Sequence, residues 1–142
     1  ISACRILVVD DNRDGAESLA QLLRQKHNEV EVALNGYDAL ERMEEFGPDA
    51  VLLDIGLPGM NGYEVCRTIR DRSTDGHTVV IATSGWGQEE DRRRTREAGF
   101  DAHLVKPVQE QELMALLAGF LPDKAPADSS NWERLKRVVR RR

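Results

Sequence analysis

Short apolar runs alternate with longer segments of helical periodicity along the chain. The runs cover residues 5–10 (RILVVD), 29–34 (EVEVAL), 49–54 (DAVLLD), 78–83 (TVVIAT) and 102–106 (AHLVK), and each predicts a β-strand. Three of them, with VV, VLL and VVIA, hold apolar residues in succession rather than in alternation. Successive apolar residues are typical of strands that helices cover on both faces, so the pattern predicts a parallel sheet.

The segments between and after these runs carry apolar residues three or four positions apart, as on the buried face of a helix. Five β–α repeats with right-handed crossovers predict a doubly wound α/β fold, a three-layer α/β/α sandwich around a five-stranded parallel sheet. The predicted buried faces are Ala16, Leu19, Ala20 and Leu23; Leu40, Met43 and Phe46; Val65, Cys66 and Ile69; and Leu113, Leu116, Leu117 and Phe120.

The fourth predicted helix, over residues 87–98 (GQEEDRRRTREA), differs from the others because it has almost no apolar face. Its support within the helix comes from the pairs Glu89–Arg93 and Glu90–Arg94, each worth about 0.3 kcal/mol. We therefore expect it to be the least firmly anchored helix.

Composition and charge divide the chain into a body and a tail. The 142 residues suit one domain, which we expect over residues 1–122, with 13 Lys and Arg against 22 Asp and Glu, net −9. Residues 123–142 carry 7 against 3, net +4, and Trp132, Leu135 and Val139 share one helical face. This segment is predicted to be a linker and a short basic amphipathic helix or tail, which docks on the acidic body or is solvated rather than binding nucleic acid.

Two further features bear on location. No apolar run approaches the roughly 20 residues that cross a bilayer, so we expect no membrane span in this segment. We expect a cytoplasmic location, which includes the case of the cytoplasmic part of a membrane-bound kinase. Cys4 and Cys66 have no metal-ligand spacing, and they predict reduced, half-buried thiols.

Chemically active side chains stand where the predicted strands end. The first strand ends in Asp10 and Asp11, the third in Asp54, the fourth in Thr83 and the fifth in Lys106. The carboxyl ends of parallel strands share one edge of a sheet, where ligands bind in open α/β folds. We therefore expect three carboxylates, a hydroxyl and an ammonium to converge there.

The charge of this cluster restricts its chemistry. Two carboxylates about 4 Å apart repel by about 4 kcal/mol at an effective dielectric constant near 20, so three of them need cations. Lys106 offsets one charge, and a hard divalent ion such as Mg²⁺ (or Mn²⁺), with oxygen ligands, offsets the rest. The cluster predicts a carboxylate nucleophile beside a metal, with Thr83 and Lys106 able to hold phosphoryl oxygens.

Four motifs occur in order along the chain: VVDDN, LLDIGLPGMNG, ATSG and HLVKP. With them, the chain resembles the receiver domain of bacterial two-component response regulators from Arg5 to about Leu121. The resemblance implies a flavodoxin-like (βα)₅ fold with strand order 2-1-3-4-5. It also implies a phosphoprotein of a phosphorelay, which catalyses only its own phosphorylation and dephosphorylation.

The resemblance assigns a role to each acid. Asp54 is the implied phosphoacceptor, which takes a phosphoryl group from a phosphohistidine of a histidine kinase or a histidine phosphotransfer protein. Asp11 would bind Mg²⁺ directly, Asp10 mostly through water, and Asp54 and the backbone carbonyl of Gly56 would complete the protein ligands.

The resemblance also implies residues that bind the phosphoryl group and residues that shape the loops around it. Lys106 would pair with Asp54 and then with the phosphoryl group, and its peptide bond to Pro107 is expected to be cis. Pro58 and Gly62, with Gly59 between them, would shape the loop after Asp54.

A switch is implied as well. Thr83 would move to bind a phosphoryl oxygen, and His103, at the position of a switch aromatic, would swing inward. The surface of the fourth helix, fifth strand and fifth helix would then change, and it is also the candidate face for a homodimer. Because imidazole titrates near pH 6.5, coupling between phosphorylation and protonation of His103 is a further hypothesis.

The chain departs from the family pattern in two places. Relatives usually have Gly after the first helix, whereas this chain has His27 and Asn28, of which Asn tolerates the left-handed conformation better. Gly56 and Gly85 occupy positions whose side chains tune dephosphorylation in the family, and the sign of the effect stays open.

Several readings of the whole protein stay open. The residues of the motifs most resemble those of receivers at the carboxyl end of hybrid histidine kinases. A stand-alone regulator is the alternative. A remote alternative is a phosphatase with an Asp nucleophile, but that class uses an Asp-x-Asp pair on the first strand, where this chain has adjacent acids.

Overall fold

The computed structural model of the chain describes residues 4–72, 78–85 and 92–121. Within them, strands and helices alternate as the sequence pattern predicts, and each observed strand boundary lies within one residue of the expected one. The elements are β1 (Arg5–Val9), α1 (Arg13–Gln25), β2 (Glu29–Ala33), α2 (Gly36–Phe46), β3 (Ala50–Asp54), α3 (Gly62–Arg72), β4 (Val79–Ser84), α4 (Arg92–Ala98), β5 (Ala102–Val105) and α5 (Glu110–Phe120).

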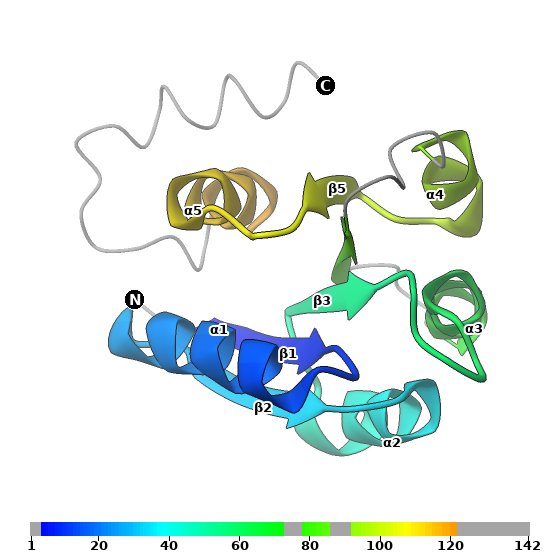
Figure 1. Cartoon of the computed structure of the whole chain (residues 1–142), viewed down its shortest axis with the longest axis horizontal. Coiled ribbons are helices and arrows are strands. Elements are labelled where there is room, and N and C mark those ends of the chain that lie inside the picture. Colours follow the sequence, from blue (N-terminus) through cyan, green and yellow to red (C-terminus); the bar gives the residue numbers. More distant parts are fainter. Residues whose placement is uncertain (1–3, 73–77, 86–91, 122–142) are drawn as a thin grey trace.

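The five strands form one parallel sheet in the order β2-β1-β3-β4-β5, which confirms the predicted flavodoxin-like topology. Helices α1 and α5 cover one face of the sheet, and α2, α3 and α4 cover the other (Figure 1). The central strands β1, β3 and β4 are almost wholly buried, because side chains on both of their faces meet helices. The prediction of a three-layer sandwich is confirmed.

Two apolar clusters lie on opposite faces of the sheet. One joins α1 and α5 to the sheet through residues such as Ile6, Leu23 and Leu116. The other joins α2 and α3 to it through residues such as Leu53 and Val65. The sheet is therefore fixed from both sides, and its carboxyl edge is a rigid platform for side chains.

Helix α1 ends in a Schellman motif that settles which residue takes the left-handed conformation. His27 has φ = 70° and its N–H donates to the carbonyl of Arg24 at 3.0 Å. Asn28 instead donates its backbone N–H and its side-chain Nδ2 to the carbonyl of Leu23, at 3.3 and 3.0 Å. The expectation that Asn is the better candidate is wrong, because Asn28 is held by these two bonds to the last turn.

Replacing His27 with Gly is expected to raise the free energy of unfolding by about 1 kcal/mol. The left-handed backbone conformation costs a residue with a Cβ atom about that much, glycine adopts it freely, and the His27 side chain is exposed. Urea denaturation measures the change. Asn28→Gly is the matched control, and it should lower stability by removing the bond from Nδ2 to Leu23. A loss of stability in His27→Gly would show that the ring makes a contact worth more than the strain.

Helix α4 is observed over Arg92–Ala98, where Thr95 and Ala98 are buried. The start of the predicted helix and its pairs Glu89–Arg93 and Glu90–Arg94 lie outside the described residues. The tail predicted over residues 123–142 also lies outside them. The described part of α4 has the narrow buried face that the sequence predicts.

Both cysteines are free thiols and both are buried, with Cys4 at 4% and Cys66 at 0% exposure, rather than half-buried as expected. Burial raises the pKa of the Cys66 thiol from 9.0 to about 11, since the apolar surroundings disfavour the thiolate.

This shift gives a pH dependence of stability. Between pH 9 and 11 the unfolded thiol ionises while the folded one stays protonated, so the free energy of unfolding falls as the pH rises through this window. Cys66→Ala should remove that part of the decline, measured as the difference between the two proteins in urea titrations at pH 8, 9, 10 and 11. Parallel curves for the two proteins would contradict the assignment.

In the part of the chain that the structure describes, no helix is long and apolar enough to cross a membrane.

Candidate functional site

The residues predicted to carry chemistry meet at the carboxyl edge of the sheet. Asp10 and Asp11 follow β1, Asp54 is the last residue of β3, and Lys106 follows β5. Thr83 pairs with Asp54 in the register of β3 and β4. The sheet order places β1, β3 and β4 side by side, so the fold brings these residues to the same edge.

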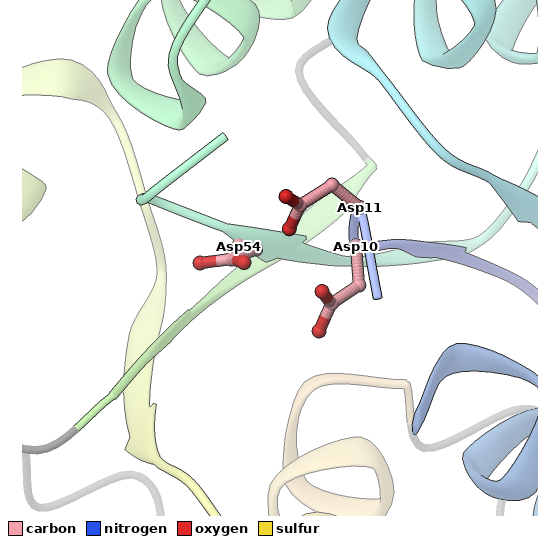
Figure 2. Close-up of side chains that lie close together, drawn as sticks. All are labelled: Asp10, Asp11 and Asp54. Carbon is pink, nitrogen blue, oxygen red and sulfur yellow. The ribbon is translucent and has the colours of Figure 1, made fainter. Parts of the chain in front are cut away.

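Three carboxylates form the centre of the site. One oxygen each of Asp10, Asp11 and Asp54 lies within 4.8 Å of the others. Figure 2 shows Asp10 and Asp11 extending from the end of β1 and Asp54 from the end of β3. Asp54 is buried and Asp11 is exposed, so the cluster runs from the sheet to solvent. Carboxylate oxygens at this spacing suit a hard divalent cation such as Mg²⁺, which prefers oxygen ligands and keeps several waters.

Lys106 bridges two of the acids. Its Nζ donates to Asp10 Oδ2 at 2.7 Å and to Asp54 Oδ2 at 3.0 Å. Partial burial lowers the pKa of Lys106, but the hydrogen bonds and charges of Asp10 and Asp54 outweigh it, so the pKa lies above its usual value. The ammonium therefore stays charged at neutral pH and offsets part of the acidic charge.

Backbone N–H groups hold the other carboxylate oxygens. Asp10 Oδ1 accepts from Asn12 N at 3.0 Å, and Asp54 Oδ1 accepts from Gly56 N at 2.8 Å. Asn12 in turn caps α1 by accepting from Gly15 N at 3.1 Å. The carboxylates of Asp10 and Asp54 are therefore each oriented by the turn that follows their own strand, before any ligand binds.

The segment after Asp54 packs closely on the strand. Pro58 is exposed and Gly59 takes φ = 73°, whereas Gly62 is buried and its N–H donates to the carbonyl of Ile55 at 3.3 Å. A Cβ atom on Gly62 would lie 2.5 Å from the carbonyl oxygen of Asp54. Across the site, the peptide bond between Lys106 and Pro107 is cis.

His103, the second residue of β5, is partly buried on the sheet face that α4 covers. Its Nε2 forms a hydrogen bond with Oγ of Ser84, which is fully buried at the end of β4. Ser84 and the bond from Lys106 to Asp10 are site features that the sequence pattern does not predict. A polar residue within the apolar run of β4, beside Thr83, is the signal that could have identified Ser84.

Known proteins share this fold and these sequence motifs. The sequence profile of the response regulator receiver domain matches residues 6–118. A CheY-like response regulator receiver domain protein from Methanospirillum hungatei superposes with a TM-score of 0.77 at 30% identity, covering 87% of this chain and 97% of that chain.

Two curated relatives differ in length. PilG of Pseudomonas aeruginosa is 29% identical over 125 residues, which make up 88% of this chain and 93% of PilG. The transcriptional regulatory protein PrrA of Mycobacterium leprae is 36% identical over 133 residues, which make up 94% of this chain and 56% of PrrA. The chain thus spans nearly all of one relative and about half of the other. Fold, acidic cluster and profile agree, and the chain belongs to the response regulator receiver domain family of two-component systems.

Proposed function

We propose that Asp54 takes a phosphoryl group from a phosphohistidine of a histidine kinase or a histidine phosphotransfer protein. The observation that carries the proposal is the cluster in which Asp10, Asp11 and Asp54 place oxygens within 4.8 Å, with Lys106 Nζ 3.0 Å from Asp54. Asp54 fits the nucleophile because its carboxylate is buried between two hydrogen-bond donors at the centre of the sheet edge.

In the transfer, a carboxylate oxygen of Asp54 attacks phosphorus and a P–O bond forms. The P–N bond to the donor imidazole breaks, its electron pair stays on nitrogen, and that nitrogen is protonated by solvent. Such a reaction needs positioning and charge neutralisation more than covalent help from the protein. Lys106 supplies a fixed positive charge beside the attacking carboxylate oxygen and the phosphoryl oxygens, and Thr83 supplies a hydroxyl.

The acids fit a divalent metal. As the family resemblance implies, Asp11, Asp54 and the carbonyl of Gly56 would hold Mg²⁺ or Mn²⁺, with Asp10 acting mostly through water. When bound, the metal neutralises charge on the phosphoryl oxygens. The protein's own part is to hold the carboxylates of Asp10 and Asp54 in place through the N–H groups of Asn12 and Gly56.

The output we propose is a change of the α4-β5-α5 surface. Thr83 moves toward the phosphoryl group and His103 moves with it. The same face is our candidate for a homodimer contact.

For the whole protein we propose the carboxyl-terminal receiver of a hybrid histidine kinase, in the cytoplasm, with residues 1–122 as the receiver and 123–142 as a linker and basic tail. A stand-alone regulator is the alternative. The encoded protein sequence upstream of Ile1 distinguishes the two, because a kinase core there identifies a hybrid.

Phosphorylation by a phosphohistidine-carrying phosphotransfer protein tests the function. With Mg²⁺ present we expect one phosphoryl group per chain by intact mass, lost on treatment with hydroxylamine as an acyl phosphate is. With excess EDTA the incorporation should fall to background. Incorporation that persists in EDTA, or that survives hydroxylamine, would contradict an aspartyl phosphate formed with a metal.

A further inference from the structure

Two arginine side chains connect α3 with α4 and with the turn that follows α4. Arg70 of α3 donates from Nε to the carbonyl of Gly99, just past α4, at 2.9 Å, and from its Nη2 to Asp101 at 2.7 Å. Few apolar side chains of α4 are buried in its described part, where Thr95 and Ala98 face inward. Polar anchoring of this kind is easier to rearrange than a broad apolar face, because water can replace the partners.

The second arginine runs in the opposite direction, from α4 back to α3. The guanidinium carbon of Arg94 lies 4.1 Å from the centroid of the Tyr63 ring, within the range of a cation–π interaction. The Tyr63 ring also meets Phe100, beyond α4, edge-on with centroids 6.3 Å apart. The Tyr63 ring thus contacts both Arg94 of α4 and Phe100, which lies two residues beyond the end of α4.

Tyr63 is tied directly to the acidic site. It follows Gly62, whose buried backbone approaches the Asp54 carbonyl so closely that a Cβ atom would lie 2.5 Å from that oxygen. The N–H of Gly62 also donates to the carbonyl of Ile55. A displacement of the backbone at 54–56 must therefore be passed to the first turn of α3, because the packing leaves no gap to absorb it.

The chemical state of Asp54 acts on that backbone. Asp54 Oδ1 accepts from the N–H of Gly56 at 2.8 Å. A phosphoryl group or its mimic on Asp54 changes the charge and the directions in which its oxygens accept, so the bond to Gly56 has to adjust.

From these contacts we propose that Tyr63 and Arg94 are positioning residues that connect the state of Asp54 to the position of α4. The inference rests on the proposed function and adds a route through α3 to the one through Thr83 and His103. The contact between Arg94 and Tyr63 stabilises the arrangement described here, and loading of Asp54 weakens it. By linkage, removing the contact must then strengthen binding at Asp54.

Hydrogen exchange of the α4 amides with and without beryllofluoride and Mg²⁺ tests this route in the full chain. In wild type we expect beryllofluoride to speed the exchange of residues 92–98. In Arg94→Gln the exchange without beryllofluoride should already be about threefold faster, and the further increase on loading should shrink by the same factor. The apparent affinity for beryllofluoride, followed by ¹⁹F NMR, should rise about threefold.

Three variants serve as controls. Arg93→Gln removes the exposed arginine next in sequence, which also has a glutamate four residues before it, and should change exchange and affinity far less than Arg94→Gln. Arg94→Lys keeps a cation over the ring and should restore much of the response. Tyr63→Leu also removes the contact with Phe100, so it should show at least the effect of Arg94→Gln. The double variant should add nothing to Tyr63→Leu, because the ring that Arg94 contacts is already absent.

The outcomes separate this inference from the proposed function. Failure of wild type to bind beryllofluoride with Mg²⁺ overturns the proposed function and the route with it. Wild-type binding, together with an Arg94→Gln protein whose beryllofluoride affinity and loading response equal those of wild type, overturns the route alone. The route is also overturned if Arg94→Gln speeds exchange by the same factor with and without beryllofluoride and leaves the affinity for beryllofluoride unchanged. A purely structural contact behaves in that way.

Discussion

Asp54→Asn is expected to abolish phosphate incorporation, with a loss of at least about 10³-fold in initial rate, because an amide oxygen cannot form the acyl phosphate. Asp54 is the acid that the fold prepares for this role: its carboxylate is buried, with Lys106 on one oxygen and the N–H of Gly56 on the other. Asn has the same shape and keeps one acceptor oxygen, enough for one of these two bonds. The variant should therefore keep its fold by circular dichroism.

Asp11→Asn and Asp10→Asn provide the comparison. Each removes a charge that holds the metal while leaving the nucleophile in place, and we expect a residual rate about 10 to 100-fold below wild type, partly recovered at high Mg²⁺ concentration. Initial rates with the same phosphohistidine donor measure all three variants. Phosphate found on Asp10 or Asp11, with Asp54→Asn still active, would reverse the assignment and favour the Asp-nucleophile phosphatase reading.

The sequence predicts the architecture well because hydrophobic periodicity and strand-end chemistry are local signals. Consecutive apolar residues such as those of 51–53 identify buried parallel strands, and a parallel sheet brings the residues after its strands to one edge. The chemistry at the strand ends alone places Asp10, Asp54 and Lys106 together. It does not say which acid is the nucleophile, and that distinction came from the family resemblance.

What the sequence could not supply depends on packing in three dimensions. The bond between Ser84 and His103 joins side chains from two strands whose offset only the register fixes. His27 takes the left-handed conformation because Asn28 is bonded twice to Leu23. Arg94 lies over Tyr63, whereas the sequence offered only the pair Glu90–Arg94 within the helix. In each case several partners are chemically acceptable, and geometry selects one.

The second large effect is expected at Gly62, where substitution by Ala should lower the free energy of unfolding by about 3 kcal/mol. The added Cβ would lie 2.5 Å from the carbonyl oxygen of Asp54 and 2.6 Å from the Cα of Ile55. Both obstacles are backbone atoms at the end of β3, and β3 is fixed there by its pairing with β4, where Asp54 lies opposite Thr83. Overpacking against such atoms costs about 1–3 kcal/mol, and the upper end applies where the neighbour cannot move away.

Gly15→Ala is the matched control for this effect. A Cβ atom at Gly15, in the first turn of α1, meets the Asn12 side chain at an ordinary 3.6 Å. This change should therefore raise stability by about 0.5 to 1 kcal/mol through helix propensity alone. Urea denaturation of both variants gives the two signs directly.

The same pair of variants separates a local packing defect from an effect on the phosphorylation site. Any relaxation that accommodates the methyl group added at Gly62 must move the Asp54 carbonyl, because that oxygen is the nearest obstacle. Gly62→Ala should therefore also slow phosphorylation, whereas Gly15→Ala should leave the rate unchanged. A Gly62→Ala protein as stable as wild type would mean that the loop after β3 can withdraw from the strand, and the rigid attachment of α3 to the phosphorylation site would then be wrong.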